Sequence, residues 1–124
     1  MDTAKFQGYQ KPIDEVKQYI GSHLDQTLNR SILATITDFS VPHFHRIFSA
    51  IVGENLYGYI RRMRMERAGR KLRMGAVDIT EVALAAGYDS HAAFSKAFKR
   101  YYGLSPSEFR SLDCRSATLI LKKG

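Results

Sequence analysis

The sequence has a single cysteine, Cys114, and no tryptophan among its 124 residues. One thiol cannot form an internal disulfide or a multi-cysteine zinc site, and it is typical of a reducing cytosol. Apolar runs are far shorter than the roughly 18 residues that a membrane-spanning helix needs. The first ten residues have neither the apolar run of a signal peptide nor the arginines of a transit peptide. We therefore expect a cytoplasmic protein without a membrane partner.

Acidic residues are also few. Twelve Asp and Glu stand against 19 Lys and Arg, giving a formal net charge of +7 and a pI near 9.7. A pI above ~9 is typical of nucleic-acid-binding domains. From Arg61 to Arg73 there are seven basic residues and one acid, Glu66. Such a run indicates either a nucleic-acid contact or a solvated helix face.

Residues suited to catalysis or metal binding are not grouped in the sequence. His43 and His45 are close together, but alternate residues on a helix point about 200° apart. No second cluster of His, Cys or paired carboxylates completes a metal site, and there is no glycine-rich phosphate loop. We expect no enzymatic activity, no catalytic or metal-ligating residues and no cofactor.

Apolar residues recur at helical spacing along most of the chain, and 44% of the residues are apolar, which is enough for a core. The pattern predicts an all-α fold of about seven helices. Asn29 and Ser40 are suitable N-caps, and Gly53 and Gly103 are suitable stops. The long helix has an apolar stripe that includes Met63. The expected helices cover about residues 12–24, 29–37, 40–53, 57–74, 80–86 and 90–102, with a short one after residue 105.

A unit of short helix, turn, longer helix and glycine occurs twice. Phe44, Phe48 and Gly53 recur as the same residue types fifty positions later. Phenylalanines four residues apart seat the second helix on a core and leave its opposite face polar. An exposed helix with short polar and basic residues suits the major groove of B-DNA. One such helix pair alone could be an ordinary αα-hairpin, but the repeat predicts two helix-turn-helix units.

These residues resemble the AraC/XylS family of bacterial transcription regulators. Residues 33–53 look like the first helix-turn-helix of the family, and residues 59–68 are similar to its linker helix. The second unit is the more specific match. It includes the motifs Ala86-Gly87-Tyr88-Asp89-Ser90 and Phe94-Ser95-Lys96-Ala97-Phe98-Lys99.

The resemblance implies two helix-turn-helix subdomains joined by a long linker helix. An N-terminal extension, residues 1–11, precedes a DNA-binding domain, residues 12–112. Its first unit covers about residues 12–53, the linker helix about 57–74 and the second unit about 79–112.

In function, the resemblance implies a sequence-specific regulator, either an activator or a repressor, that binds double-stranded promoter DNA in the nucleoid. Its two recognition helices would enter successive major-groove segments, roughly 34 Å apart. RNA polymerase is an implied partner, and an effector domain or small-molecule inducer would lie outside this chain. The alternative is a non-specific, basic nucleic-acid-binding or protein-interaction helical module.

The resemblance also implies roles for single residues. Arg46 or Lys96 could donate to guanine O6 and N7. Pro42, in the first recognition helix, could make only an apolar contact with a DNA base. Arg64 matches an arginine of the linker helix, with either a structural ion pair or a DNA contact as its role. The base-reading candidates are His45 and Arg46 in the first recognition helix and His91, Ala92, Ser95 and Lys96 in the second. The phosphate-contacting candidates are Arg61, Arg110 and the helix start at Ser105.

The last residues, 113–124, do not continue the repeat. Residues 117–121 look like a short strand. Two explanations stand: a docked or disordered terminus, or the start of a β-containing effector domain of a larger regulator.

Overall fold

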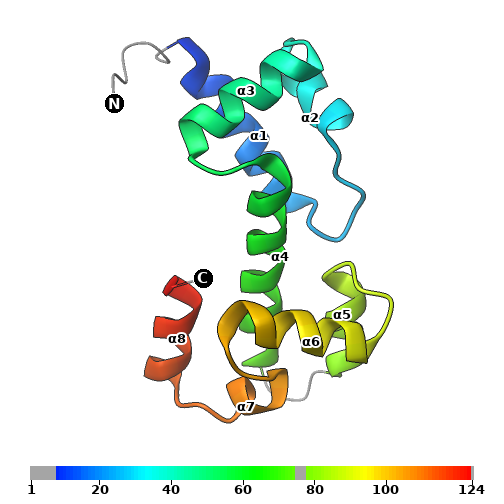
Figure 1. The fold of residues 1–124 in the computed structure, drawn as a ribbon, viewed down its shortest axis with the longest axis vertical. Helices are drawn as coiled ribbons and strands as arrows, with labels where there is room; N and C mark the ends of the chain where they lie inside the picture. The colour runs from blue at the N-terminus through cyan, green and yellow to red at the C-terminus, as the bar shows by residue number, and fades with distance from the viewer. Residues whose placement is uncertain (1–7, 75–77, 124) are drawn as a thin grey trace. The chain divides into compact units, whose positions relative to one another are not determined.

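The computed structural model describes residues 8–74 and 78–123, with side chains described as far as residue 121. The described residues form helices and no strand (Figure 1). The all-α prediction is therefore confirmed. The helices are α1 (Gln10–Ser22), α2 (Arg30–Thr37), α3 (Val41–Val52), α4 (Leu56–Leu72), α5 (Ile79–Ala85), α6 (His91–Tyr102), α7 (Pro106–Arg110) and α8 (Cys114–Lys123).

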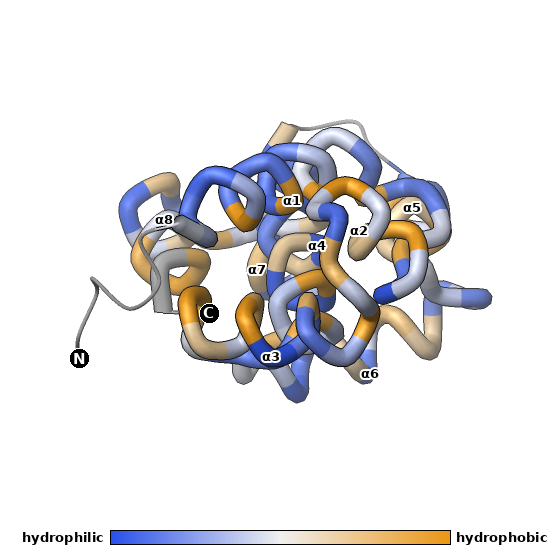
Figure 2. Tube along the Cα trace, turned by 90° about the horizontal axis from the view of Figure 1, so that it is seen from above, coloured by the Kyte–Doolittle hydropathy of each residue, from blue (hydrophilic) through white to orange (hydrophobic). Residues whose placement is uncertain are grey.

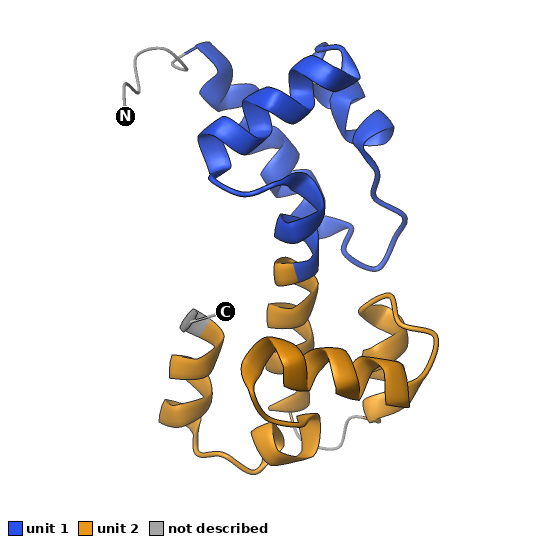
Figure 3. Ribbon diagram, viewed as in Figure 1, with its two compact units in different colours: residues 1–61 blue, residues 62–124 orange. Residues whose placement is uncertain are grey.

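The chain divides into two compact units, residues 1–61 and 62–124, and the division falls within α4 (Figure 3). Apolar and polar residues alternate along the helices, so that each unit can bury one side of each helix (Figure 2). In unit 1, α1, α2, α3 and the start of α4 contribute the buried residues. These include Ile13, Val16, Ile20, Leu33, Ala34, Phe44, Ile47, Phe48, Leu56, Tyr59 and Ile60.

Side chains at the predicted positions cap the helices. The Asn29 side chain accepts a hydrogen bond from the Ile32 amide at 2.9 Å at the start of α2. Ser40 accepts one from the His43 amide at 3.3 Å at the start of α3. Gly53 ends α3 with a φ of 88°, a left-handed conformation that glycine adopts without a Cβ clash. Local sequence thus sets both ends of α3.

Unit 2 is built around a second core. Met65, Ala68 and Leu72 of α4 are buried there, and their three- and four-residue spacing places them on one face of the helix. Phe98 lies 5.6 Å from Phe94 and 5.4 Å from Phe109, measured between ring centroids. The remaining buried members of this core are Val82, Ala83, Ala86 and Ala117.

One residue of the predicted apolar stripe was misplaced. The stripe included Met63, but Met63 is only half-buried, whereas Met65 is 1% exposed. The prediction assumed that one face of α4 is buried along its whole length. The two ends of α4 instead contribute to two separate cores.

The predicted strand over residues 117–121 was wrong, because these residues belong to helix α8. The Asp113 carboxylate accepts a hydrogen bond from the Ser116 amide at 2.7 Å, which caps the helix. Ala117 is buried, and Ile120 and Leu121 pack against the core of unit 2. The spacing of these three residues suits a helix docked by one face, and this tertiary contact overrides the β-propensity of the segment.

Gly69 permits the close approach of α8 to α4. A Cβ at position 69 would lie 2.6 Å from Cδ2 of Leu121 and 3.6 Å from the ring of Phe109. The first distance is shorter than a carbon–carbon contact allows. Any side chain at this position would therefore displace Leu121.

A double-mutant cycle tests this contact. Alanine is favoured over glycine inside a helix by about 0.8–1 kcal/mol, but the Gly69→Ala methyl group must displace Leu121. We expect Gly69→Ala to raise the free energy of unfolding by about 0.5–1 kcal/mol more in a Leu121→Ala background than in the unaltered chain. Urea unfolding measures both values.

The matched control is Gly21→Ala in α1, where an added Cβ meets nothing within 4 Å. Its effect should be the same in both backgrounds. An equal effect of Gly69→Ala in both backgrounds would show that α8 does not pack on Gly69.

Candidate nucleic-acid interface

The first helix-turn-helix consists of α2, a turn and α3. Asp38 closes α2 with a φ of 64°, an uncommon left-handed conformation for a residue other than glycine that Asp tolerates well. Phe44, Ile47 and Phe48 bury one face of α3. Arg46 is exposed on this helix. The turn and the buried face together leave Arg46 accessible to a ligand.

His45 is less accessible than its neighbour. Its side chain is half-buried, and its Nδ1 atom is buried without a hydrogen-bond partner among the described residues. The histidine at position 43 belongs to an aromatic cluster, with its ring centroid 5.6 Å from that of Tyr9 and 4.9 Å from that of Phe39. Within the described chain, no three His, Cys, Asp or Glu side chains form a group that could hold a metal ion.

The second helix-turn-helix consists of α5, a turn and α6. Gly87 supplies the left-handed residue of the turn, with a φ of 93°. The Tyr88 ring packs edge-on against Phe94 at 5.8 Å between centroids. Ser90 caps α6 by accepting a hydrogen bond from the Ala93 amide at 3.1 Å. These contacts fix the angle at which α6 leaves the turn.

The four base-reading candidates of α6 share one face of the helix. His91, Ala92, Ser95 and Lys96 follow the i, i+1, i+4, i+5 spacing that places side chains next to one another. His91, Ala92 and Lys96 are exposed and Ser95 is half-buried. Because Phe94 and Phe98 bury the other side of α6, this set faces away from the core of unit 2.

The phosphate candidates differ in their surroundings. Arg61 is exposed on α4. Ser105 already forms a capping box with Glu108: the Ser105 amide donates to Glu108 Oε1 at 2.9 Å, and the Glu108 amide donates to Ser105 Oγ at 3.1 Å. These bonds lower the pKa of the Glu108 carboxyl, so it is ionised at neutral pH. Arg110 is half-buried, and its Nε donates to the Leu72 carbonyl at 3.3 Å.

Arg73 is a structural residue that the sequence did not distinguish within its basic run. Its Nη1 donates to the carbonyls of Phe109 at 3.2 Å and Arg110 at 2.8 Å, where α7 ends. Its Nη2 lies 3.9 Å from Sγ of Cys114. Arg73 therefore ties the end of α4 to α7 and to the start of α8.

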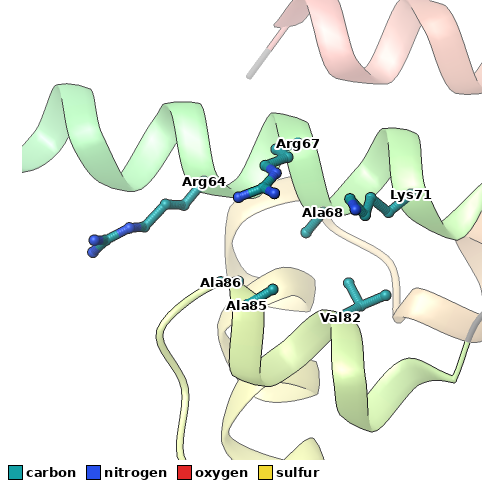
Figure 4. Close-up of a pocket in the computed structure, with 7 residues that line it drawn as sticks. All are labelled: Arg64, Arg67, Ala68, Lys71, Val82, Ala85 and Ala86. Atoms are coloured by element: carbon teal, nitrogen blue, oxygen red, sulfur yellow. The ribbon is translucent and has the colours of Figure 1, made fainter. Parts of the chain in front are cut away.

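The rest of the basic run is also divided in its roles. Arg62 forms an ion pair with Glu66 at 3.2 Å, one helical turn away. Arg64 lies along α4 toward the α5–α6 turn, where a Cβ on Gly87 would be 3.6 Å from its Nη1 (Figure 4). Burial lowers the pKa of the Arg64 guanidinium, and the neighbouring Tyr88 partly opposes that shift.

Two helix-turn-helix units with exposed polar faces on a basic chain define a DNA-binding protein. A family model described as a helix-turn-helix domain matches residues 33–111. The regulatory protein SoxS of Escherichia coli K12 is 32% identical over 102 residues, covering 82% of this chain and 95% of SoxS. The chain belongs to the AraC/XylS family of helix-turn-helix transcription regulators.

Further relatives agree with this family. The activator AarP of Providencia stuartii is 34% identical over 109 residues, covering 88% of this chain and 81% of AarP. The regulator YbfP of Bacillus subtilis is 32% identical over 103 residues, covering 83% of this chain, but the match spans only 35% of YbfP. These relatives are transcription regulators and not enzymes.

Solved structures show the same fold. The DNA-binding domain of AdpA, a global transcriptional factor solved in complex with a target DNA, has a TM-score of 0.72 and 28% identity, covering 81% of this chain and 90% of that domain. An AraC-type regulator from Chromobacterium violaceum has a TM-score of 0.76 at 23% identity, covering 84% and 93%, which shows the fold alone. The chain is a sequence-specific DNA-binding transcription regulator and not an enzyme. No described helix is long and apolar enough to cross a membrane.

The structural role of Arg73 can be tested against a neighbour. Arg73→Ala removes two charge-assisted hydrogen bonds to carbonyl groups at the end of α7, so we expect the free energy of unfolding to fall by about 1–3 kcal/mol. Arg70→Ala removes the same charge from an exposed position in the last turn of α4 and should change the free energy of unfolding by less than about 0.5 kcal/mol. Urea denaturation measures both, and equal small effects would contradict the anchoring role.

Proposed function

We propose that this regulator reads promoter bases with α3 and α6, each inserted into a major-groove segment. The observation that carries the proposal is the exposed set on α6, held outward by two buried phenylalanines. Such a helix presents donors and acceptors at the spacing of base edges. The matching face of α3 supports a second contact, so that one chain would read two successive segments of the duplex.

The two recognition helices would read different bases. By the fifty-residue repeat, Arg46 corresponds to Lys96 and His45 to Ser95. Arg46 can donate two parallel hydrogen bonds to guanine O6 and N7, whereas Lys96 acts as a point charge without that fork. Ala92 can contact only a thymine methyl group. We therefore propose an asymmetric binding site.

Arg61 is the proposed phosphate contact on α4, since it is exposed and is the last residue of unit 1. Ser105 and Arg110 stay predictions as phosphate contacts. The Ser105 amide already donates to the Glu108 carboxylate, and Nε of Arg110 already donates to the Leu72 carbonyl. Each residue therefore has one donor fewer for a phosphate. Arg61 is therefore the variant with which to test the phosphate contribution.

At the level of the cell, we propose a transcription activator that acts on the nucleoid in the cytoplasm and contacts RNA polymerase. The support is the relative AarP, which is named as an activator. The match covers 95% of SoxS but only 35% of YbfP, so YbfP is much the longer of these two relatives. An effector domain or a small-molecule inducer outside the described residues is therefore a further proposal.

Base reading by Arg46 is tested by Arg46→Ala. Loss of a bidentate contact to guanine should cost about 1–3 kcal/mol on the preferred duplex and relax the preference at one or two base pairs. Selection of duplexes from a random pool, followed by competition against bulk DNA at about 150 mM salt, measures both effects. A protein that binds selected and bulk DNA equally would be the non-specific alternative, and the proposal would be lost.

Phosphate binding by Arg61 predicts a different result. Arg61→Ala should weaken binding to all duplexes about equally and reduce the slope of log K against log salt by about 1. Lys17→Ala in α1 removes the same charge from another exposed position and serves as the control. If Arg61→Ala instead changes the base preference, the phosphate assignment is wrong.

A further inference from the structure

Tyr9 lies near the start of the described chain, before residues 33–111, which match the helix-turn-helix family model. It occupies the N-cap position of α1, where side chains with an oxygen acceptor, such as Ser or Asp, are preferred. Its side chain makes no capping hydrogen bond. The contribution of Tyr9 is therefore packing against other parts of unit 1 and not the start of its own helix.

The Tyr9 ring contacts both the turn of the first helix-turn-helix and the first turn of α3. Its centroid is 5.5 Å from that of Phe39, with an angle of 80° between the ring planes. The ring of His43 lies 5.6 Å from the Tyr9 ring at 87° and 4.9 Å from the Phe39 ring. Edge-to-face contact at such separations is a favourable arrangement of aromatic rings. We call Tyr9, Phe39 and His43 the Tyr9 cluster.

The two helix-turn-helix units hold their turns in different ways. In the second unit, the turn residue Tyr88 packs on the buried Phe94 of α6 at 5.8 Å. In the first unit, the matching turn residue Phe39 makes no ring contact with a buried phenylalanine of α3 among the described residues. Its ring contacts are with Tyr9 and His43 instead. The packing of α3 against its turn therefore includes a ring from outside the repeat.

The Tyr9 cluster lies close to the base-reading candidate Arg46. His43 precedes Arg46 by three residues, so the two side chains are neighbours on one face of α3. A guanidinium that donates to guanine O6 and N7 must reach both atoms at once, which requires the helix that carries it to be held in place. The contact of Tyr9 with His43 holds α3 one helical turn before Arg46.

We propose that Tyr9 is a positioning residue for base reading by the first unit. Its ring holds the first turn of α3 against Phe39 and so sets the direction in which Arg46 extends. The inference rests on the proposed reading of bases by α3. It adds that the specificity of this helix depends on a residue that precedes the part of the chain matched by the family model. The ring acts here, and the hydroxyl group of Tyr9 is not needed.

The experiment uses the full chain and two duplexes of equal length, one selected from a random pool by the unaltered chain and one unrelated. Fluorescence anisotropy measures both affinities at about 150 mM salt. Tyr9→Ala should weaken binding to the selected duplex about three- to tenfold, the factor that corresponds to a lost aromatic contact, and binding to the unrelated duplex less than about twofold. Tyr9→Phe keeps the ring and should bind both duplexes like the unaltered chain.

A double-mutant cycle shows whether Tyr9 acts through Arg46. In the Tyr9→Ala background, Arg46→Ala should weaken the selected duplex by a factor about two- to fivefold smaller than in the unaltered chain. The matched control is Tyr19→Ala, because the Tyr19 ring stacks on His23 at 3.8 Å, a tyrosine–histidine contact that does not involve α3. It should show no such coupling. Thermal melting checks each variant, and Tyr9→Leu, which lacks the ring but keeps apolar volume, replaces Tyr9→Ala should the latter fail to fold.

Three results would overturn this inference and leave the proposed function intact. The first is an equal effect of Tyr9→Ala and Tyr19→Ala, or an equal loss on both duplexes, because either means a general loss of stability. The second is additive effects of Tyr9→Ala and Arg46→Ala. The third is a loss with Tyr9→Phe as large as with Tyr9→Ala, which would make the hydroxyl group a DNA contact. If Arg46→Ala itself leaves binding to the selected duplex unchanged, the proposed function is wrong and this inference with it.

Discussion

The paired phenylalanines of the two recognition helices determine what the rest of each unit can do. Each pair is fully buried: Phe44 and Phe48 in α3, and Phe94 and Phe98 in α6. Within each pair the ring centroids are less than 6 Å apart. Burying an aromatic ring stabilises the fold by about 1.5–3 kcal/mol, and rotating it outward would lose that contribution. The helix therefore cannot turn about its axis, and its polar face must point outward. The face proposed to read DNA therefore depends on the packing of these rings.

The basic run from Arg61 to Arg73 shows that equal charges take different roles when their surroundings differ. Arg62 forms an ion pair with Glu66, and Arg73 binds backbone carbonyls at the end of α7. Arg67 and Lys71 are half-buried and border a small hollow between α4 and α5. Exposed ion pairs contribute little to stability, whereas a guanidinium that binds otherwise unpaired carbonyls contributes more. Residues of one basic run thus differ in the contacts that they make within the chain.

The two helix-turn-helix units have the same order of helices but differ in the turn between the two helices. The second unit has Gly87 in the left-handed position, while the first places Asp38 there, at a steric cost that Asp tolerates. The first recognition helix has Pro42 in its first turn, and the second has Ala92 at the matching place. Both helices form, because caps at Ser40 and Ser90 satisfy their first amides. The difference between the units therefore lies in their turn residues and exposed side chains, and not in whether the helices form.

The sequence by itself determined the helices from α1 to α7, the predicted caps, the repeat and the outward face of α6. These follow from interactions between residues a few positions apart, such as the Ser40 cap, which can be recognised from the local sequence. Only the tertiary structure decided that residues 117–121 are helical, that Met65 is buried and that Arg73 anchors α7. Each depends on a partner distant in the chain, as Leu121 does on Gly69. Local periodicity contains no information about such contacts, which is why these features could not be read from the sequence.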